Sequence, residues 1–277
     1  MGEKEKMKKT NAVVFCALSL LLLSLTVGVK AYNADYTHTL YQSDTDPTID
    51  GTYIVDADWL SSGSEDFGDG SIFHDQWVMT PNLYCCIVEV TDNTTEAGDK
   101  LTICFDGTET GGDTQPDGGA NPTAYDKKLE ITGHGGSETI QWFVGDGSGW
   151  VTATASAELM TFAQSLTSTP SISADHYVYE MKFDKNGDTS LGSVLVPYQW
   201  AEFVSYYDAN TTETQQWPPT PASANVPDGW GYVIYEQNPN PTPTIPEGIS
   251  IFAMIALSSV AAAGALALRK QKIAKFN

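Results

Sequence analysis

Positive charge is scarce in the central part of this 277-residue chain. Between residues 32 and 245 there are 32 Asp and Glu residues, five Lys and no Arg, which gives this segment a formal charge of about −27. A field of that sign repels nucleic acid and anionic lipid. Nucleic-acid binding is therefore excluded. Cation binding, a high-salt exterior and simple solubility all remain compatible with the charge.

Signatures of catalysis are also lacking. The sequence contains no Gly-x-Ser-x-Gly, His-Glu-x-x-His or Cys/His arrangement. Paired carboxylates are too frequent in so acidic a chain to indicate a general acid and base. Four isolated histidines are present, and we expect them to be satisfied or exposed: His38, His74, His134 and His176. The sequence therefore predicts a protein that is not an enzyme.

Cysteine is rare, with four residues in the whole chain. Cys16 lies in the N-terminal apolar run, which leaves an odd number, Cys85, Cys86 and Cys104, in the body. No Cys-x-x-Cys spacing indicates zinc. Neighbours in a strand point to opposite faces, so only one of Cys85 and Cys86 can pair with Cys104. We expect that single disulfide; three buried free thiols are the alternative.

Long apolar runs occur only at the two ends of the chain. Residues 1–31 combine four early lysines, an apolar run and a small-residue site at Ala31, a pattern typical of a secretory signal peptide. An uncleaved anchor is the alternative. Residues 249–268 carry no charge and are long enough to span a bilayer, and the basic residues of 269–277 should stay cytoplasmic. We therefore expect the body to lie outside the cell, tethered at its C-terminus.

The segment before that span, residues 237–248, is rich in proline and predicts a stiff, extended stalk. Its end, Ile245-Pro246-Glu247-Gly248, together with the apolar span and the basic end, resembles the Pro-Glu sorting tails of prokaryotic surface proteins. That resemblance implies that a sortase-like protease removes the helix and attaches the chain to lipid. A permanent transmembrane anchor is the alternative.

The body, residues 32–236, alternates short apolar runs with polar, glycine-rich loops. Residues 83–92 and 99–106 are rich in β-branched and aromatic residues and predict a β-hairpin. Residues 157–166 are the only stretch of the body expected to form a helix. Roughly nine short strands predict an all-β fold, an antiparallel β-sandwich, with one C-terminal transmembrane helix beyond it.

Several short motifs follow one another along the body. They are Ile49-Asp50-Gly51 with Trp59, Leu83-Tyr84, Val90-Thr91-Asp92, Gly98–Asp106, Tyr177–Met181, Phe203–Asp208 and Trp217-Pro218. Their order and spacing resemble the family 9 carbohydrate-binding modules over most of residues 47–236. The resemblance implies a β-sandwich related to the DOMON group, which binds sugars or haem outside cells.

In the family 9 modules two tryptophans clamp a terminal sugar, and calcium supports the fold. By position, Trp217 matches the second clamp tryptophan, whereas Glu96 stands where the first is expected. Relatives in the DOMON group bind haem through Met and His. Such residues are present here, although nothing in the sequence pairs them, and we do not expect haem: Met79, Met181, His74 and His176.

Aromatic residues in predicted loops are the candidate sugar contacts, because the C–H groups of a pyranose pack against a π surface. They are Trp217 in a proline-flanked loop, Trp142 and Trp150 on either side of a glycine-rich tip, and Trp230 after Pro-Asp-Gly. Packing in the core is the alternative role for each.

Two loops carry the oxygen donors that Ca²⁺ prefers. The first begins like a calcium loop, with Asp184, Asn186 and Asp188, but has Leu195 in place of the final glutamate. The second, the long loop of residues 106–123, offers Asp106, Asp113 and Asp117.

Asn93 and Asn210 each begin an Asn-x-Thr glycosylation pattern in a predicted loop. With the secretory signal, these patterns fit a glycoprotein. The sequence therefore predicts a non-catalytic, membrane-tethered cell-surface module that contacts glycan through loop aromatics, with calcium support. The alternatives are a structural or adhesive envelope protein and a haem-carrying electron-transfer domain.

Overall fold

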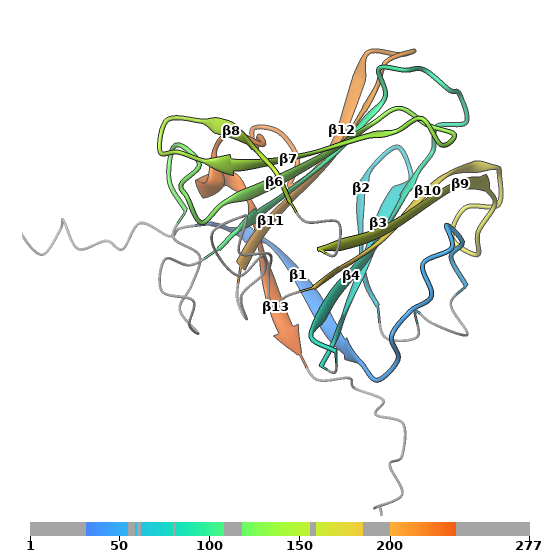
Figure 1. The fold of residues 1–277 in the computed structure, drawn as a ribbon, viewed down its shortest axis with the longest axis horizontal. Helices are drawn as coiled ribbons and strands as arrows, with labels where there is room; N and C mark the ends of the chain where they lie inside the picture. The colour runs from blue at the N-terminus through green and yellow to red at the C-terminus, as the bar shows by residue number, and fades with distance from the viewer. Residues whose placement is uncertain are drawn as a thin grey trace, which may run out of the picture. The chain divides into compact units, whose positions relative to one another are not determined.

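A computed structural model describes residues 32–54, 59, 62–79, 81–107, 118–155, 159–184 and 200–236. They form an all-β fold (Figure 1). The strands within the described residues are β1 (Asn33–Ser43), β2 (Gly63–Gly68), β3 (Ser71–Val78), β4 (Leu83–Val90), β5 (Lys100–Asp106), β6 (Lys127–Thr132), β7 (Thr139–Gly145), β8 (Trp150–Ala153), β9 (Met160–Thr167), β10 (His176–Asp184), β11 (Trp200–Asp208), β12 (Glu213–Trp217) and β13 (Gly231–Glu236).

Hydrogen bonds join these strands into one mixed sheet in the order β8-β7-β6-β5-β11-β13-β1-β3-β4-β10-β9, with β12 on β11 and β2 on β3. β1 runs parallel to both of its neighbours, β13 and β3. The prediction of a wholly antiparallel arrangement is therefore wrong at β1. Parallel neighbours need a long connection, and the segment of residues 44–62 provides it between β1 and the β2–β3 pair.

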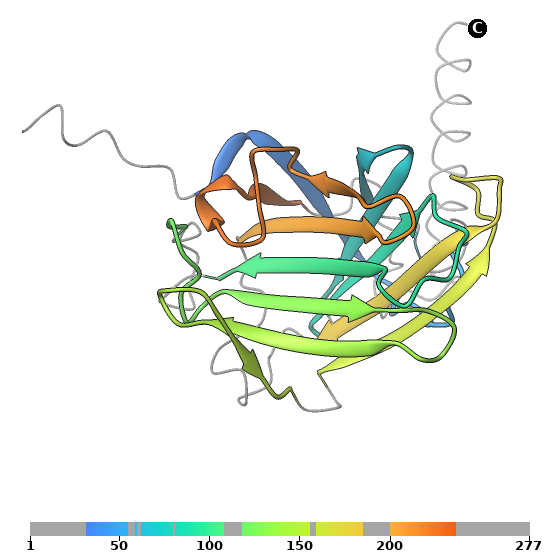
Figure 2. The ribbon, with the colours of Figure 1, turned by 90° about the horizontal axis from the view of Figure 1, so that it is seen from above.

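The sheet curls so that its two halves face each other across the core (Figures 1 and 2). The ring of Tyr84, on β4, meets the ring of Phe105, on β5, edge to face at 5.7 Å between centroids. Phe105 also contacts Phe183 of β10 at 5.8 Å. These contacts belong to one large buried cluster, and removing its apolar surface from water is the main force that holds the halves together.

The predicted hairpin of residues 83–92 and 99–106 is wrong. β4 pairs with β3 and β10, whereas β5 pairs with β6 and β11, so residues 91–99 carry the chain from one half of the sheet to the other. Both strands are buried along nearly their whole length, as central strands are, and their sequences do not specify their neighbours. The predicted helix of residues 157–166 is wrong as well, because residues 160–167 form the strand β9, which pairs antiparallel with β10.

Glu180 on β10 ties the segment of residues 50–59 to the sheet. Its Oε2 accepts hydrogen bonds from the backbone N–H groups of Asp50 and Gly51, each at 2.7 Å, and its Oε1 accepts one from the Trp59 indole at 3.0 Å. Gly51 has φ +83°, and a Cβ there would lie 3.0 Å from the backbone of Gln164. The turn therefore requires glycine, and Glu180 fixes it to the sheet.

All three cysteines of the body are buried free thiols, so the predicted disulfide of Cys104 with Cys85 or Cys86 is wrong. β4 and β5 are not neighbours, and the three side chains lie in three separate apolar clusters. Burial raises the pKa of each thiol, which makes it unreactive in the folded protein.

Among the described residues, no helix has both the length and the apolar character needed to cross a membrane. The expected signal peptide (1–31), stalk (237–248), transmembrane helix (249–268) and basic tail (269–277) lie outside the described residues.

Candidate functional site

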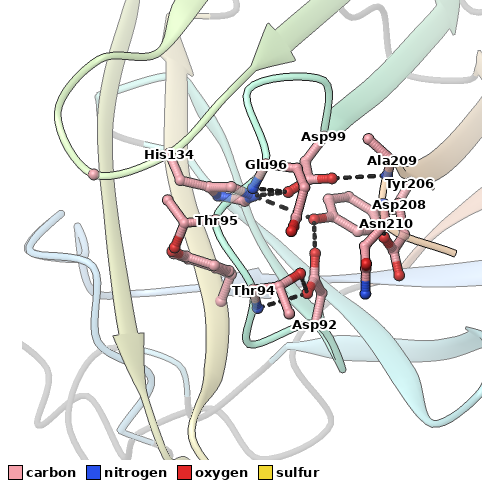
Figure 3. Close-up of polar contacts among 12 residues, drawn as sticks. Asp92, Thr94, Thr95, Glu96, Asp99, His134, Tyr206, Asp208, Ala209 and Asn210 are labelled. Carbon is pink, nitrogen blue, oxygen red and sulfur yellow. Dashed lines mark hydrogen bonds and ion pairs between the residues drawn. The ribbon is translucent and has the colours of Figure 1, made fainter.

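Four carboxylates gather where the chain leaves β4, enters β5 and leaves β11 (Figure 3). Asp92 follows β4, Glu96 and Asp99 belong to the loop before β5, and Asp208 ends β11. One oxygen of each lies within 4.8 Å of an oxygen of every other. We refer to these four residues as the carboxylate cluster.

Hydrogen bonds hold Asp99 and Asp92 in place. Asp99 Oδ1 accepts from the Ala209 N–H at 2.8 Å, and Asp99 Oδ2 accepts from the Glu96 N–H at 3.0 Å and lies 2.9 Å from His134 Nε2. Asp92 Oδ2 accepts from the Tyr206 hydroxyl at 2.6 Å. The loop before β5 and the loop after β11 are thus tied together through buried carboxylates.

Glu96 and Asp208 complete the cluster on its more open side. Glu96 Oε2 is buried and makes no hydrogen bond within the described part of the chain. Partial burial would raise the pKa of Asp208, but hydrogen bonds from Thr211 and Asn210 lower it. One oxygen of each group lies within 4.8 Å of an oxygen of Asp92 and of Asp99.

The cluster fits the calcium ion that the family resemblance implies. Its donor set consists of carboxylate oxygens, which are the ligands Ca²⁺ prefers, and Glu96 Oε2 has no other hydrogen-bond partner among the described residues. Asp92, Glu96, Asp99 and Asp208 would hold the ion. When bound, it would neutralise the repulsion among the four carboxylates and link the two loops.

A polar groove of about 460 Å³ lies on the face of β6, β5, β11 and β12 that points away from the core. Figure 2 shows β11, β5 and β6 side by side in this part of the sheet. The groove is lined by Lys100, Thr102, Lys128, Glu130, Phe203, Ser205, Tyr207, Thr214, Gln216, Ser223, Ala224 and Asn225. Its volume is that of an ordinary small-ligand site.

Strand register sets the floor of the groove. Glu130 lies opposite Thr102, Thr102 opposite Ser205, and Ser205 opposite Gln216, so one polar row crosses four strands. At the usual strand spacing this row is roughly 14 Å long. The alternate residues of the same strands, such as Leu101 in β5, face the core.

The groove offers hydroxyl groups that the protein itself leaves unused. Within the described residues, the side-chain hydroxyls of Thr102, Ser205, Tyr207 and Thr214 have no hydrogen-bond partner. Thr102 is only 5 % exposed and Ser205 9 % exposed, yet both line the groove. A ligand in the groove would meet these hydroxyls directly, beside the ring of Tyr207.

One wall of the groove carries charge. Lys128 Nζ donates to Glu130 Oε1 at 2.9 Å and lies 4.1 Å from the centre of the Phe143 ring. Lys100 Nζ lies 3.7 Å from the same Glu130 oxygen, and 38 % of its side chain is exposed. Lys128 is therefore held in place by its neighbours, whereas Lys100 is open to solvent.

The four candidate sugar-binding tryptophans do not form a clamp. Trp217, Trp142 and Trp230 are buried, and Trp217 packs against Phe73 at 5.4 Å between ring centroids. Trp150 is half-buried, with its ring parallel to that of Trp230 at 6.4 Å and its indole N–H bonded to the Ala224 carbonyl. For the three buried tryptophans, the alternative of core packing is the one that the structure favours.

The predicted calcium loops are described only in part. Asp184 ends β10, and Asp106 is buried at the end of β5, where its Oδ2 accepts the Gly118 N–H at 3.0 Å. The remaining candidates lie outside the described residues: Asn186, Asp188, Asp113 and Asp117.

Each of the four histidines contacts a buried carboxylate. His38 pairs with Asp75, His134 with Asp99, and His74 and His176 both with Glu89. Burial alone would lower the pKa of His38, but Asp75 raises it to about 10. Burial alone would raise the pKa of Glu89, but hydrogen bonds from His176 and His74 lower it to about 2.

His74 and His176, the two histidines considered as haem ligands, both contact Glu89. Their Nε2 atoms lie 2.7 and 3.1 Å from its carboxylate oxygens. The two candidate glycosylation residues, Asn93 and Asn210, are exposed next to Asp92 and Asp208. Glycans attached there would lie beside the carboxylate cluster.

Sequence reasoning named neither site. Aspartates at the ends of three strands were the available signal for the cluster, but only the fold brings Asp92, Asp99 and Asp208 together. For the groove, the signal was the alternation of polar residues in β5, β6 and β11. Comparison with protein-family models gives no match for this chain, and comparison with curated proteins gives no significant match.

Proposed function

We propose that the protein is a non-catalytic cell-surface module that binds carbohydrate in the groove of β6, β5, β11 and β12, with Ca²⁺ in the carboxylate cluster. The single observation that carries this proposal is the set of unused hydroxyls, two of them on residues that are at most 9 % exposed, on the floor of a groove of ligand size. Unused hydrogen-bonding groups at the base of a cavity favour a ligand that is itself rich in hydroxyls.

The polarity of the groove supports a saccharide over an apolar ligand. Its side chains are mostly hydroxyl, amide or charged groups, and Tyr207 supplies an aromatic ring for packing against a pyranose. The two facing halves of the sheet are compatible with the sandwich of the family 9 modules. The contact of Glu180 with Gly51 and Trp59 joins two of the motifs on which the resemblance depends.

The proposed sugar site lies elsewhere than the tryptophan clamp of the family 9 modules. Trp217 is buried, and Glu96 stands where the other clamp tryptophan is expected and belongs to the carboxylate cluster. A shared fold with a different binding surface is common among proteins. The expected secretory signal and C-terminal anchor would display the groove outside the cell.

A structural or adhesive envelope protein is the second candidate, and the burial of Trp217, Trp142 and Trp230 favours it. In that function the tryptophans serve only stability, and the groove has no ligand.

A glycan array separates the two functions. The full-length protein in mild detergent is applied to neutral and acidic glycans, with Ca²⁺ and with a chelator. Carbohydrate binding predicts selective retention on one glycan class, reduced by Tyr207→Ala and unchanged by Tyr41→Ala, a half-buried tyrosine on β1 outside the groove. No retention on any glycan under either condition would reject the proposal in favour of the structural role.

A further inference from the structure

We infer that the ligand of the groove is an acidic saccharide, a uronate whose carboxylate pairs with Lys100 beside Lys128. This inference rests on the proposed function and names its ligand class. Positive charge is scarce in this part of the molecule, and its placement is the starting observation.

Two of the five lysines between residues 32 and 245 line the groove. Of the others, Lys127 Nζ donates to the Ala124 carbonyl at 2.7 Å and Lys182 Nζ pairs with Asp46 at 2.8 Å, while Lys185 lies outside the described residues. Glu130 is the single acid among the lining residues. The groove therefore carries a net positive charge on a segment whose formal charge is about −27.

The geometry assigns that excess charge to Lys100. Glu130 Oε1 is 2.9 Å from Lys128 Nζ and 3.7 Å from Lys100 Nζ, so the shorter ion pair uses Lys128. Lys128 also packs between the Phe143 and Trp150 rings, at 4.1 and 5.3 Å from their centres. Lys100 is the more exposed of the two and can turn toward a carboxylate in the groove.

The negative field of the rest of the domain does not prevent this. At physiological ionic strength the Debye length is about 8 Å, so carboxylates farther away than that are largely screened, whereas a direct contact inside the groove is screened less. A single available lysine pairs with one carboxylate at a time. A nucleic acid, with its dense run of phosphates, would need more cations and would meet the surrounding acids.

Register places Lys100 where it can act together with the hydroxyls. Lys100 lies opposite Tyr207, and Tyr207 lies opposite Thr214, so a cation, an aromatic ring and a hydroxyl follow one another across three strands. The row of Thr102 and Ser205 runs beside them. A uronate ring over Tyr207 would direct its carboxylate to Lys100 and its hydroxyls to Thr214, Thr102 and Ser205.

Matched probes test the charge directly. Oligosaccharides of galacturonate, glucuronate and mannuronate are titrated into the full-length protein, each beside its own neutral methyl ester. We expect at least one acid to bind about two- to fivefold more tightly than its ester, as for a partly exposed ion pair. Lys100→Gln should remove that difference, so that the acid and its ester bind the variant equally.

Lys182→Gln is the charge-matched control, because Lys182 lies on β10 outside the groove, and it should retain the preference for the acid. Thermal unfolding checks that each variant is folded. Equal binding of acid and ester, or a preference that survives Lys100→Gln, overturns the inference and leaves the proposed function standing. Binding of neutral glycans alone would also overturn the inference and leave the proposed function standing. Absence of binding to every saccharide rejects both.

Discussion

The groove and the carboxylate cluster are both built on β5 and β11, yet they are held in place by different means. The groove lies along the flat of the sheet, where backbone register fixes each side chain and several hydroxyls have no partner among the described residues. The cluster lies at the strand ends, where buried carboxylates are anchored by loop N–H groups and by His134. We therefore expect stability to depend more on the cluster than on the side chains of the groove.

The largest effect should come from removing an anchor of the cluster. Asp99→Ala leaves His134 and two backbone N–H groups without their buried carboxylate, and we expect the free energy of unfolding to fall by about 3–5 kcal/mol. Denaturant unfolding measures this. Asp66→Ala, at an exposed aspartate of β2 that accepts a hydrogen bond from the Gly68 N–H, should cost no more than about 1 kcal/mol. Equal losses in the two variants would break the distinction between cluster and surface.

A second large effect should come from Glu202, on the face of β11 opposite the groove. Burial and the nearby Asp75 raise the pKa of Glu202 from 4.5 to about 8, and the pKa of His38 rises from 6.5 to about 10. The folded state thus binds protons more tightly at both groups, so the contribution of these two groups to stability is fully present below about pH 4.5 and is lost as pH rises from about 4.5 to about 10.

Glu202→Gln removes one of these two titrations. Urea unfolding at pH 5, 7 and 9 should show a shallower loss of stability in Glu202→Gln, with a difference from the wild type on the order of 3 kcal/mol at pH 9. The remaining slope, between about pH 6.5 and 10, belongs to His38. An unchanged slope would mean that Glu202 is ionised in the folded protein at neutral pH.

Calcium should have the next effect. If Ca²⁺ binds the cluster, an ion concentration one hundred times the dissociation constant raises the free energy of unfolding by about 2.7 kcal/mol. Unfolding in Ca²⁺ and in chelator measures the difference, and Glu96→Gln should reduce it, because the variant removes one of the four carboxylates. Identical stability in both buffers would show that Ca²⁺ does not bind the cluster. The proposed binding of saccharide in the groove would be unaffected.

The smallest effect should come from the groove itself. Ser205→Ala removes a hydroxyl that has no hydrogen-bond partner among the described residues, so the free energy of unfolding should change by less than about 0.5 kcal/mol. Affinity for the saccharide should nevertheless fall. A loss of stability comparable to that of Asp99→Ala would show that the groove belongs to the framework of the fold.

The sequence predicted the all-β class and several strands with clear alternation. The stretches 83–92 and 99–106, which were predicted to be strands from their β-branched and aromatic residues, contain β4 and β5. In β1, β2 and β12 the residues are largely polar and only partly buried, so their sequences carry no clear strand pattern. In these strands the sheet partners, and not local propensity, decide the conformation.

The sequence did not reveal which strands are neighbours in the sheet. β4 and β5 are consecutive, apolar and buried, and a hairpin is the local solution for such a pair. The side chains of Tyr84 and Phe105 instead meet across the core, which places the two strands in facing halves. Because the hairpin was wrong, the disulfide argued from it was wrong as well. Both candidate sites depend on neighbours that only this pairing creates.

The most direct test of the central claim is the affinity of the best array saccharide for Tyr207→Ala, measured by titration beside the wild type and Tyr41→Ala. Loss of the aromatic contact should weaken binding about tenfold or more in Tyr207→Ala, with unfolding midpoint and Tyr41→Ala affinity close to the wild type. Unchanged affinity in a folded Tyr207→Ala protein would contradict the assignment of the groove as the binding site.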